Sequence, residues 1–201
     1  MREFIYYSKT ARTTGNFDTS NLMKAGRMDI ACQIVIMSFF LSHKKRDDVK
    51  LHLIFDGPPD SPKHLEICSM EMNEKDSIHI SKKDVAGLIK RMLYKYKKDK
   101  KNEVSPGYFI EKKSFERLVD EKIEEGKEIF LLDKKGEALR EVGEEKLKDA
   151  VFILGDQDGL PKDKLKRLKK SGVNKISVGP KMYFASQVMT IIQNEIDILG
   201  I

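Results

Sequence analysis

The stretch VFILGDQDGLPKDKLKRLKKSGVNKISVGPKMY, residues 151–183, decides the fold of this chain. Its first four residues are apolar, which is typical of a short buried strand, and Gly155 ends that strand with a residue that tolerates positive φ. After an acidic loop, Pro161 suits the first turn of a helix, which we predict over residues 162–170.

A second strand and a long helix complete this part of the chain. The pattern over 175–178 predicts a strand that ends at Gly179, and residues 184–199 predict an apolar helix. The strands over 151–154 and 175–178 would lie parallel, each with a glycine at its carboxyl end. Since glycine lets the backbone approach a ligand closely, we expect a ligand-binding crevice at these strand ends.

The rest of the chain supports one α/β domain over residues 1–201, with a mostly parallel sheet and helices on both faces. Ser81 and Ser114 are expected to cap two of the helices, and a glycine-containing turn is expected over 133–136. The apolar pattern predicts further strands over 3–8, 49–55 and 128–132, a strand or strand pair over 63–71, and helices over 30–41, 82–97 and 115–125.

Charge and cysteine content limit the class of protein only loosely. The 38 Lys and Arg residues against 32 Asp and Glu residues leave a net charge of +6, which suits an anionic partner such as RNA without requiring one. Cys32 and Cys68 form no spaced motif, so we expect reduced thiols in a cytoplasmic protein. We find no signal peptide and no stretch that is apolar enough to span a membrane, and we expect no membrane partner.

Two basic segments are candidates for contact with nucleic acid. Residues 9–16, KTARTTGN, form a polar loop that contacts phosphate or simply connects two elements, and composition favours the connection. Residues 96–102, YKKDKKN, are the densest basic cluster, and their lysines together with Tyr94 and Tyr96 suit phosphates and stacked bases. A basic helix end that complements the helix dipole explains this cluster equally well.

Arg27 and Asp29 lie where the helix predicted over 30–41 begins. Residues two apart do not share a face of a regular helix, but at a helix start both side chains could reach one pocket. A helix N-cap explains Asp29 equally well, because its carboxylate would accept from the first backbone N–H groups. From the residues alone we favour the cap.

Other cofactor sites are excluded by spacing. A calcium-binding loop that began at Asp156 would need an acid at its twelfth position, where Arg167 stands. The sequence has no His or Cys cluster with zinc spacing, so we expect no metal. It also has no phosphate-binding loop and no GxGxxG fingerprint, which argues against a nucleoside triphosphate or a nicotinamide cofactor.

The residues LGDQDGLP at 154–161 and ISVGP at 176–180, followed by the C-terminal helix, resemble the SPOUT superfamily of RNA methyltransferases. Within it, the whole chain is similar to the family of archaeal tRNA pseudouridine-54 N1-methyltransferases, and the segments 17–29 and 55–59 add to the match. The resemblance implies a SPOUT-type α/β fold with a C-terminal trefoil knot. It also implies S-adenosyl-L-methionine as cofactor, tRNA as partner and a homodimer.

The same resemblance implies which residues act. Asp29 is the candidate catalytic base or base-orienter, and Arg27 would anchor phosphate or base. Many family members have a cysteine near Val188, where the valine of this chain preserves an apolar contact but no thiol role. The dimer would be two-fold and would use the helices over 184–199 and 30–41. The cofactor-binding positions carried over are Leu132, Gly155, Val178, Gly179, Pro180, Lys181, Met182, Tyr183 and Val188.

The reaction implied by the resemblance is methyl transfer to N1 of pseudouridine at position 54 in the T-loop of tRNA. In pseudouridine the ribose is attached through C5, which leaves N1–H free to react. Two alternatives remain open: a ribosomal-RNA pseudouridine N1-methyltransferase of the same fold, and a non-catalytic RNA-binding protein. The first is expected to carry a larger RNA-binding insertion, and the second would not need a cofactor crevice.

Overall fold

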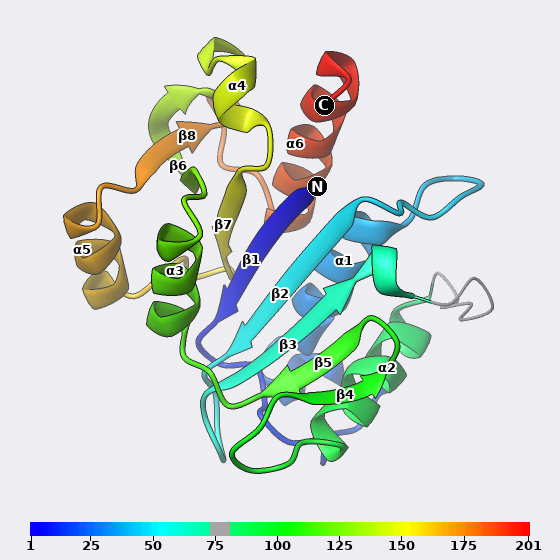
Figure 1. The fold of residues 1–201 in the computed structure, drawn as a ribbon. Coiled ribbons are helices and arrows are strands. Elements are labelled where there is room, and N and C mark those ends of the chain that lie inside the picture. The colour runs from blue at the N-terminus through cyan, green and yellow to red at the C-terminus, as the bar shows by residue number, and fades with distance from the viewer. Residues whose placement is uncertain (73–80) are drawn as a thin grey trace.

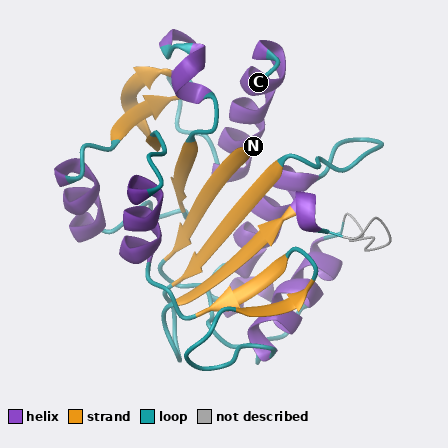
Figure 2. Cartoon of the chain, viewed as in Figure 1, coloured by secondary structure: helices purple, strands orange, loops and turns teal. Residues whose placement is uncertain are grey.

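The computed structural model describes residues 1–72 and 81–201. Within them, eight strands form a single sheet with helices on both faces (Figure 1 and Figure 2). The strands lie side by side in the order β4-β5-β3-β2-β1-β7-β6-β8. Their bounds are β1 (Arg2–Ser8), β2 (Val49–Phe55), β3 (Lys63–Cys68), β4 (Asn102–Ser105), β5 (Tyr108–Glu111), β6 (Ile129–Ala138), β7 (Val151–Gly155) and β8 (Asn174–Ser177).

The sheet has a parallel half and an antiparallel half. β1 pairs in parallel with β2 and β7, and β6 pairs in parallel with β7 and β8. The strands β2, β3, β5 and β4 follow one another in antiparallel pairs. The strands predicted over 151–154 and 175–178 are therefore parallel but not neighbours, because β6 lies between them.

The helices form two layers, as the predicted fold class requires. Three helices, α1 (Met28–Phe39), α2 (Lys82–Tyr94) and α6 (Ala185–Leu199), pack into the larger core on one face. Two others, α3 (Phe115–Glu124) and α5 (Lys162–Lys170), pack into a second core on the opposite face (Figure 1). The shorter helical segments are η1 (Leu22–Ala25), η2 (Ser69–Glu71), η3 (Leu139–Glu141) and α4 (Glu144–Leu147).

Most predicted elements are present with shifted ends. The Ser81 hydroxyl caps α2 by accepting from Asp84 N at 3.1 Å, and the Ser114 hydroxyl caps α3 by accepting from Arg117 N at 3.2 Å, as predicted. The helix predicted to reach residue 97 ends three residues earlier. The strands β4 and β5 and the helix α4, each of four residues, are missing from the prediction, whereas β8, of the same length, is predicted because Gly179 marks its end.

The strand β6 departs most from the prediction. The turn expected over 133–136 is wrong, because the strand continues through it. The register with β8 shifts there, so that both Leu132 and Glu137 pair with Ile176. A Cβ atom on Gly136 would lie 2.5 Å from the Ile176 backbone, so the glycine is needed where β6 and β8 approach closely.

The last helix, α6, packs against α1 of its own chain. Ile192 is fully buried, and Gln193 Nε2 donates a hydrogen bond to Ser38 O at 3.1 Å. The two ends of the apolar helix predicted over 184–199, Phe184 and Leu199, are exposed. The helix is therefore fixed to the rest of the chain mainly through the face that carries Ile192.

Two further sequence expectations concern the thiols and the membrane. Cys32 and Cys68 are free and buried, in agreement with the expected reduced thiols. Burial raises the pKa of the Cys32 thiol to about 12, so this thiol stays protonated near neutral pH. Among the residues that the structure describes, no helix is both long enough and apolar enough to cross a bilayer.

The Asp197 carboxylate ties α6 to two distant segments. It lies 2.6 Å from Arg46 Nη2 and 2.6 Å from Arg2 Nη1. Hydrogen bonds from Arg46, and then from Arg2, lower the pKa of Asp197 to about 2. Because this value lies below the pKa of an unfolded-chain aspartate, the carboxylate stabilises the fold above about pH 4, and this contribution is lost as the pH falls toward 2.

We predict that Asp197→Asn lowers the free energy of unfolding at neutral pH by ~1 kcal/mol, a value that allows for solvent screening of a partly exposed group. Urea unfolding at pH 7 and at pH 3 measures the effect, and the two proteins should differ less at pH 3. Asp163→Asn, an exposed change on α5, is the matched control. An equal difference at both pH values would contradict the role assigned to the ionised carboxylate.

Candidate active site

The Asp156 carboxylate joins the ends of two parallel strands. Asp156 follows β7 and is buried. Its Oδ2 accepts from Ser8 Oγ at 3.1 Å and from Lys9 N at 3.0 Å, both at the end of β1. Its Oδ1 accepts from Asp158 N at 3.0 Å. One side chain thus positions the loop after β1 relative to the loop after β7.

The loop of residues 9–16 packs against two other loops at this edge of the sheet. Thr10 Oγ1 donates to Gly26 O at 3.1 Å, and the buried Thr13 donates through its Oγ1 to Gly57 O at 3.0 Å. A Cβ atom on Gly26 would lie 1.7 Å from the Thr10 carbonyl oxygen. Most of the loop is therefore a connection, as its composition favours, although the first residue of the loop is exposed.

Arg27 and Asp29 form a bidentate ion pair at the start of α1. Arg27 Nε lies 3.0 Å from Asp29 Oδ1, and Arg27 Nη2 lies 3.0 Å from Asp29 Oδ2. Arg27 has a left-handed backbone, with a φ of 61°, and this turn allows two residues so close in sequence to face each other. Such a conformation costs a non-glycine residue ~1 kcal/mol or more, and it is enriched at functional sites.

The helix-cap interpretation of Asp29 is wrong. Arg27 occupies the cap position of α1, and Asp29 lies in the first turn with its carboxylate on the guanidinium. The hydrogen bonds from Arg27 hold the pKa of Asp29 below its usual range. The two residues that the resemblance assigns to catalysis are thus brought together, with the acid kept ionised.

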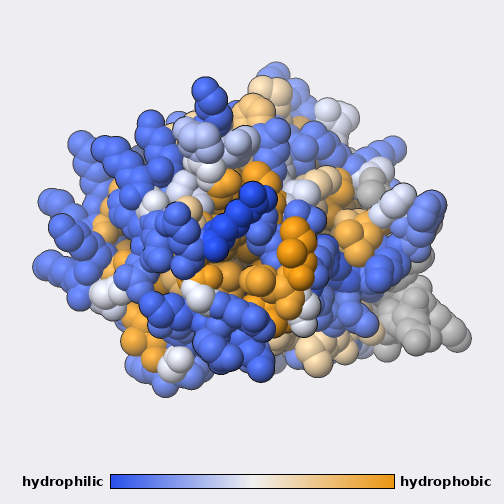
Figure 3. Space-filling model, turned by 90° about the horizontal axis from the view of Figure 1, so that it is seen from above, coloured by the Kyte–Doolittle hydropathy of each residue, from blue (hydrophilic) through white to orange (hydrophobic). Residues whose placement is uncertain are grey.

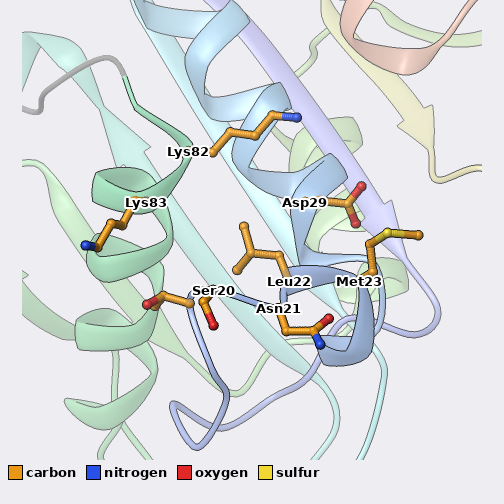
Figure 4. A pocket seen from close by; sticks show the side chains of 8 residues that line it. Ser20, Asn21, Leu22, Met23, Asp29, Lys82 and Lys83 are labelled. Atoms are coloured by element: carbon orange, nitrogen blue, oxygen red, sulfur yellow. The ribbon is translucent and has the colours of Figure 1, made fainter.

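Asp29 lines a pocket of about 510 Å³ (Figure 4). Figure 4 shows the Asp29 carboxylate close to Met23, while Lys82 extends toward the same side and Lys83 points away. A pocket with an acid, lysines and apolar groups matches the mixed character of a nucleotide. Its walls are formed by Thr19, Ser20, Asn21, Leu22, Met23, Asp29, Lys82 and Lys83.

Tyr6 is a candidate that the sequence analysis missed. Its buried hydroxyl has no well-formed hydrogen bond within the described part of the chain, although the Ser8 hydroxyl is a neighbour. Burial, and then the charges of Asp156 and Asp29, raise the pKa of Tyr6 above its usual range. A buried hydroxyl near these acids is available to a ligand. No local signal marks it, because Tyr6 lies in a strand of similar apolar residues.

Three of the predicted cofactor positions form an apolar wall. Leu132 lies within β6, Val178 directly follows β8, and Val188 lies near the start of α6. All three are partly buried and pack against the larger core. An adenine ring binds against apolar side chains, so these three residues fit the adenine of S-adenosylmethionine.

Residues 179–183 form the exposed rim next to this wall. Gly179 has a φ of 151°, a conformation that side chains rarely adopt, and the Tyr183 ring lies 3.4 Å from the place of a Cβ atom there. Pro180, Lys181 and Met182 are exposed. Among the described hydrogen bonds, none is donated by the backbone N–H groups of residues 181–183, so these groups are available to the polar parts of a cofactor.

Position 155 has to be a glycine because the loop that follows it occupies the space of a side chain. A Cβ atom there would lie 2.7 Å from the Gly159 carbonyl carbon and 2.9 Å from Leu160 N. The glycine is thus required by the loop that follows it, and positive φ occurs at Gly159 instead. A larger residue at position 155 would disturb this loop before it reached any cofactor.

The two parts of the candidate site are distinct. All nine predicted cofactor positions lie in the described part of the chain, and none lines the pocket of Asp29. The loop after β7 lies near the ion pair, since the charge of Asp158 adds to the rise in the pKa of Arg27 that Asp29 causes.

Comparisons with known proteins agree over the whole chain. A family model described as "Putative SAM-dependent RNA methyltransferase" matches residues 1–201. A Vibrio parahaemolyticus protein named "Putative pseudouridine methyltransferase" is 34% identical over 98% of both chains. The tRNA (pseudouridine(54)-N(1))-methyltransferase of Methanococcoides burtonii is 33% identical over 98% of this chain and 96% of its own.

A solved structure confirms the type of fold. The crystal structure of Archaeoglobus fulgidus Nep1 bound to S-adenosylhomocysteine superposes on this chain with a TM-score of 0.68, covering 99% of this chain and 98% of the other. The two sequences are only 12% identical, so the likeness concerns the arrangement of strands and helices.

We predict that Asp156→Asn lowers the free energy of unfolding by ~1–3 kcal/mol, because an amide nitrogen cannot accept the hydrogen bonds that one carboxylate oxygen now accepts. Amide hydrogen exchange at Lys9 should also become faster, since its N–H loses an acceptor. Urea unfolding and hydrogen exchange measure the two effects, with Asp163→Asn as control. A variant with wild-type stability and exchange would show that the strand ends do not depend on this carboxylate.

Proposed function

Because the chain belongs to the family of S-adenosylmethionine-dependent RNA methyltransferases, we propose that it methylates N1 of pseudouridine at position 54 in the T-loop of tRNA. The observation that carries the proposal is the Arg27–Asp29 ion pair at the wall of a pocket that suits a nucleotide. It is supported by archaeal relatives, about one third identical to this chain, that are named for this activity.

The ion pair suits a reaction in which N1–H of pseudouridine loses its proton. When bound, S-adenosylmethionine supplies the methyl group as an electrophile on a sulfonium sulfur. The Asp29 carboxylate accepts a hydrogen bond from N1–H and orients it, or takes up the proton directly. Because Arg27 lowers the pKa of Asp29, the carboxylate is a weak base, so orientation is its main contribution and the N1 proton passes on to solvent water. Uridine offers no N1–H to this group.

The cofactor in this proposal lies against Leu132, Val178 and Val188, with the rim 179–183 holding its polar groups. Gly155 contributes backbone rather than empty space, since its own loop fills the position of a side chain. The trefoil knot implied by the resemblance stays a prediction for this C-terminal part of the chain.

The two basic segments lie close enough to form one RNA-binding surface. A Cβ atom on Gly15 would lie 2.5 Å from the Tyr94 ring, so the loop 9–16 packs on the end of α2 where the basic cluster begins. Lys101 is engaged in an ion pair with Glu66 at 2.9 Å. We therefore assign phosphate contacts to the exposed lysines Lys9, Lys97, Lys98 and Lys100.

A homodimer is part of the same proposal. On α6, Ile198 is 67% exposed and Leu199 is 41% exposed. Figure 3 shows apolar side chains gathered among hydrophilic ones on the upper surface, the side on which Figure 1 places α4 and the C-terminal end of α6. An exposed apolar group of this kind is typical of a contact surface between subunits.

We predict that Ile198→Glu converts a dimer into a monomer at micromolar concentration, because it places a charge in an apolar contact. Light scattering measures the change. Ile192 is unsuitable for this test, since it is fully buried within its own chain and a charge there would unfold the protein. Asn194→Gln, an exposed change on α6, is the control. A monomeric wild type would overturn the dimer.

The substrate is tested with two tRNA transcripts that differ only in whether position 54 has been converted to pseudouridine beforehand. We predict methylation of the converted transcript alone, measured by mass spectrometry after digestion. Equal methylation of both would refute N1 chemistry. Methylation of a ribosomal fragment instead would favour the ribosomal alternative, and RNA binding with neither cofactor binding nor methyl transfer would favour the non-catalytic one.

The role of Asp29 is tested in the same assay. Asp29→Asn should lower kcat by ~100-fold or more, as expected for loss of a group that positions or accepts a proton. Its affinity for S-adenosylhomocysteine, measured by calorimetry, should remain within about twofold of wild type, because the cofactor positions lie outside its pocket. Asp163→Asn is the matched control. A variant that keeps its rate and loses only stability would assign Asp29 a structural role.

A further inference from the structure

A row of buried polar side chains lies on the sheet face that carries α3 and α5, opposite the face on which α1 packs. His52 and His64 form its centre, and each is 1% exposed. His52 Nε2 lies 2.7 Å from Glu3 Oε1, and His64 Nδ1 lies 3.0 Å from Glu111 Oε1. The two imidazoles meet through His52 Nδ1 and His64 Nε2, 2.8 Å apart. These residues take no part in the methyl transfer proposed above.

Strand register brings the row together. In the antiparallel pair β2–β3, His52 lies directly opposite Glu66, and His64 follows two residues away on the same face. In the next pair, β3–β5, His64 lies directly opposite Glu111. Two histidines that are far apart for a sequence motif thereby become neighbours.

Each acid in this region has a lysine partner and therefore acts as a hydrogen-bond acceptor toward the imidazoles. A carboxylate held by an ammonium group has no hydrogen of its own to donate. The pairs are Glu3 with Lys122 at 2.8 Å, Glu66 with Lys101 at 2.9 Å and Glu111 with Lys113 at 2.9 Å.

The two neutral imidazoles have one N–H hydrogen fewer than their three contacts with Glu3, with each other and with Glu111 need. A neutral imidazole carries a single N–H. Because Glu3 and Glu111 accept, His52 Nε2 and His64 Nδ1 must carry those hydrogens. The two facing nitrogens, His52 Nδ1 and His64 Nε2, are then both bare lone pairs at 2.8 Å. Lone pairs repel each other at this distance, so the geometry requires a cation between them.

We propose that His52, His64 and Glu66 form a binding site for one divalent transition-metal ion of the zinc class. One ligand atom from each lies within 4.8 Å of the others. Tetrahedral ligands at ~2.05 Å from zinc lie ~3.3 Å apart. Here His52 Nδ1 is 2.8 Å from His64 Nε2 and 3.8 Å from Glu66 Oε2, so each of these two separations has to change by about half an ångström when the ion binds.

The surroundings suit a bound metal ion. Glu3 and Glu111 accept N–H from the far side of each imidazole, which fixes the tautomer and strengthens the ring as a ligand. Two imidazole nitrogens and one carboxylate oxygen favour zinc over magnesium or calcium. The Lys101 side chain, which is 42% exposed, would move away from Glu66 and so give the metal ion access to the carboxylate. The ion would clamp β2 to β3, where the sheet changes from parallel to antiparallel.

The test starts with the wild-type protein, stripped of metal with a chelator. Zinc chloride is titrated by calorimetry, and cobalt chloride by visible absorption. We expect one ion per chain, the absorption bands of four-coordinate cobalt, and a Tm that rises with zinc concentration. His64→Gln should weaken zinc binding by ~100-fold or more, beyond the range measured for changes around a metal site. His43→Gln, an exposed histidine outside the row, is the matched control and should bind as wild type does.

Glu66→Gln separates loss of a ligand from misfolding, because it removes the charge and keeps the shape. It should weaken zinc binding while circular dichroism remains that of the wild type. The proposal is overturned if the wild-type protein binds neither zinc nor cobalt in a one-to-one ratio, or if His64→Gln binds as tightly as His43→Gln. Nitrogen-15 spectra of the imidazoles would in that case identify a shared proton as the cation between them.

Discussion

The edge of the sheet where the loops after β1 and β7 meet depends on the buried carboxylate of Asp156. It accepts hydrogen bonds from Ser8 and Lys9 at the end of β1 and from Asp158 in its own loop. Ser8 Oγ in turn accepts from Ala11 N at 3.2 Å, so the loop after β1 is held where it contacts the start of α1. A buried carboxylate without these donors would be costly, and the loops therefore keep one arrangement.

The same arrangement explains how a strained residue is maintained at the site. Arg27 keeps a left-handed backbone because the preceding Gly26 is packed on the carbonyl of Thr10. That conformation turns the guanidinium onto Asp29, and the acid is held ionised at the wall of the pocket. Local strain and ion pairing thus hold one charge, in one protonation state, at the wall of the pocket.

The two faces of the sheet bury polar groups in different ways. On the α1 face, α1, α2 and α6 form a large apolar core, and Asp29 lines the pocket at the start of α1. On the α3 face, His52 and His64 are buried within the sheet itself and are bounded by acids that carry lysine partners. Asp29 therefore stays accessible to a ligand in the pocket, whereas His52 and His64 link the neighbouring strands β2 and β3.

The sequence by itself determined what depends on neighbours along the chain. The apolar alternation of 49–55 and the caps Ser81 and Ser114 are local signals, so the bounds of β2 were predicted correctly, and those of α2 and α3 differ only at their C-terminal ends. The resemblance also selected Arg27 and Asp29. Only the tertiary structure decided their ion pair, the course of β6 past Gly136 and the use of Gly155 by its own loop. It also decided the burial of the Tyr6 hydroxyl, which has no well-formed hydrogen bond within residues 1–72 and 81–201, and the contact of His52 with His64. These features depend on strand register and on close approach of distant segments, which no local pattern contains.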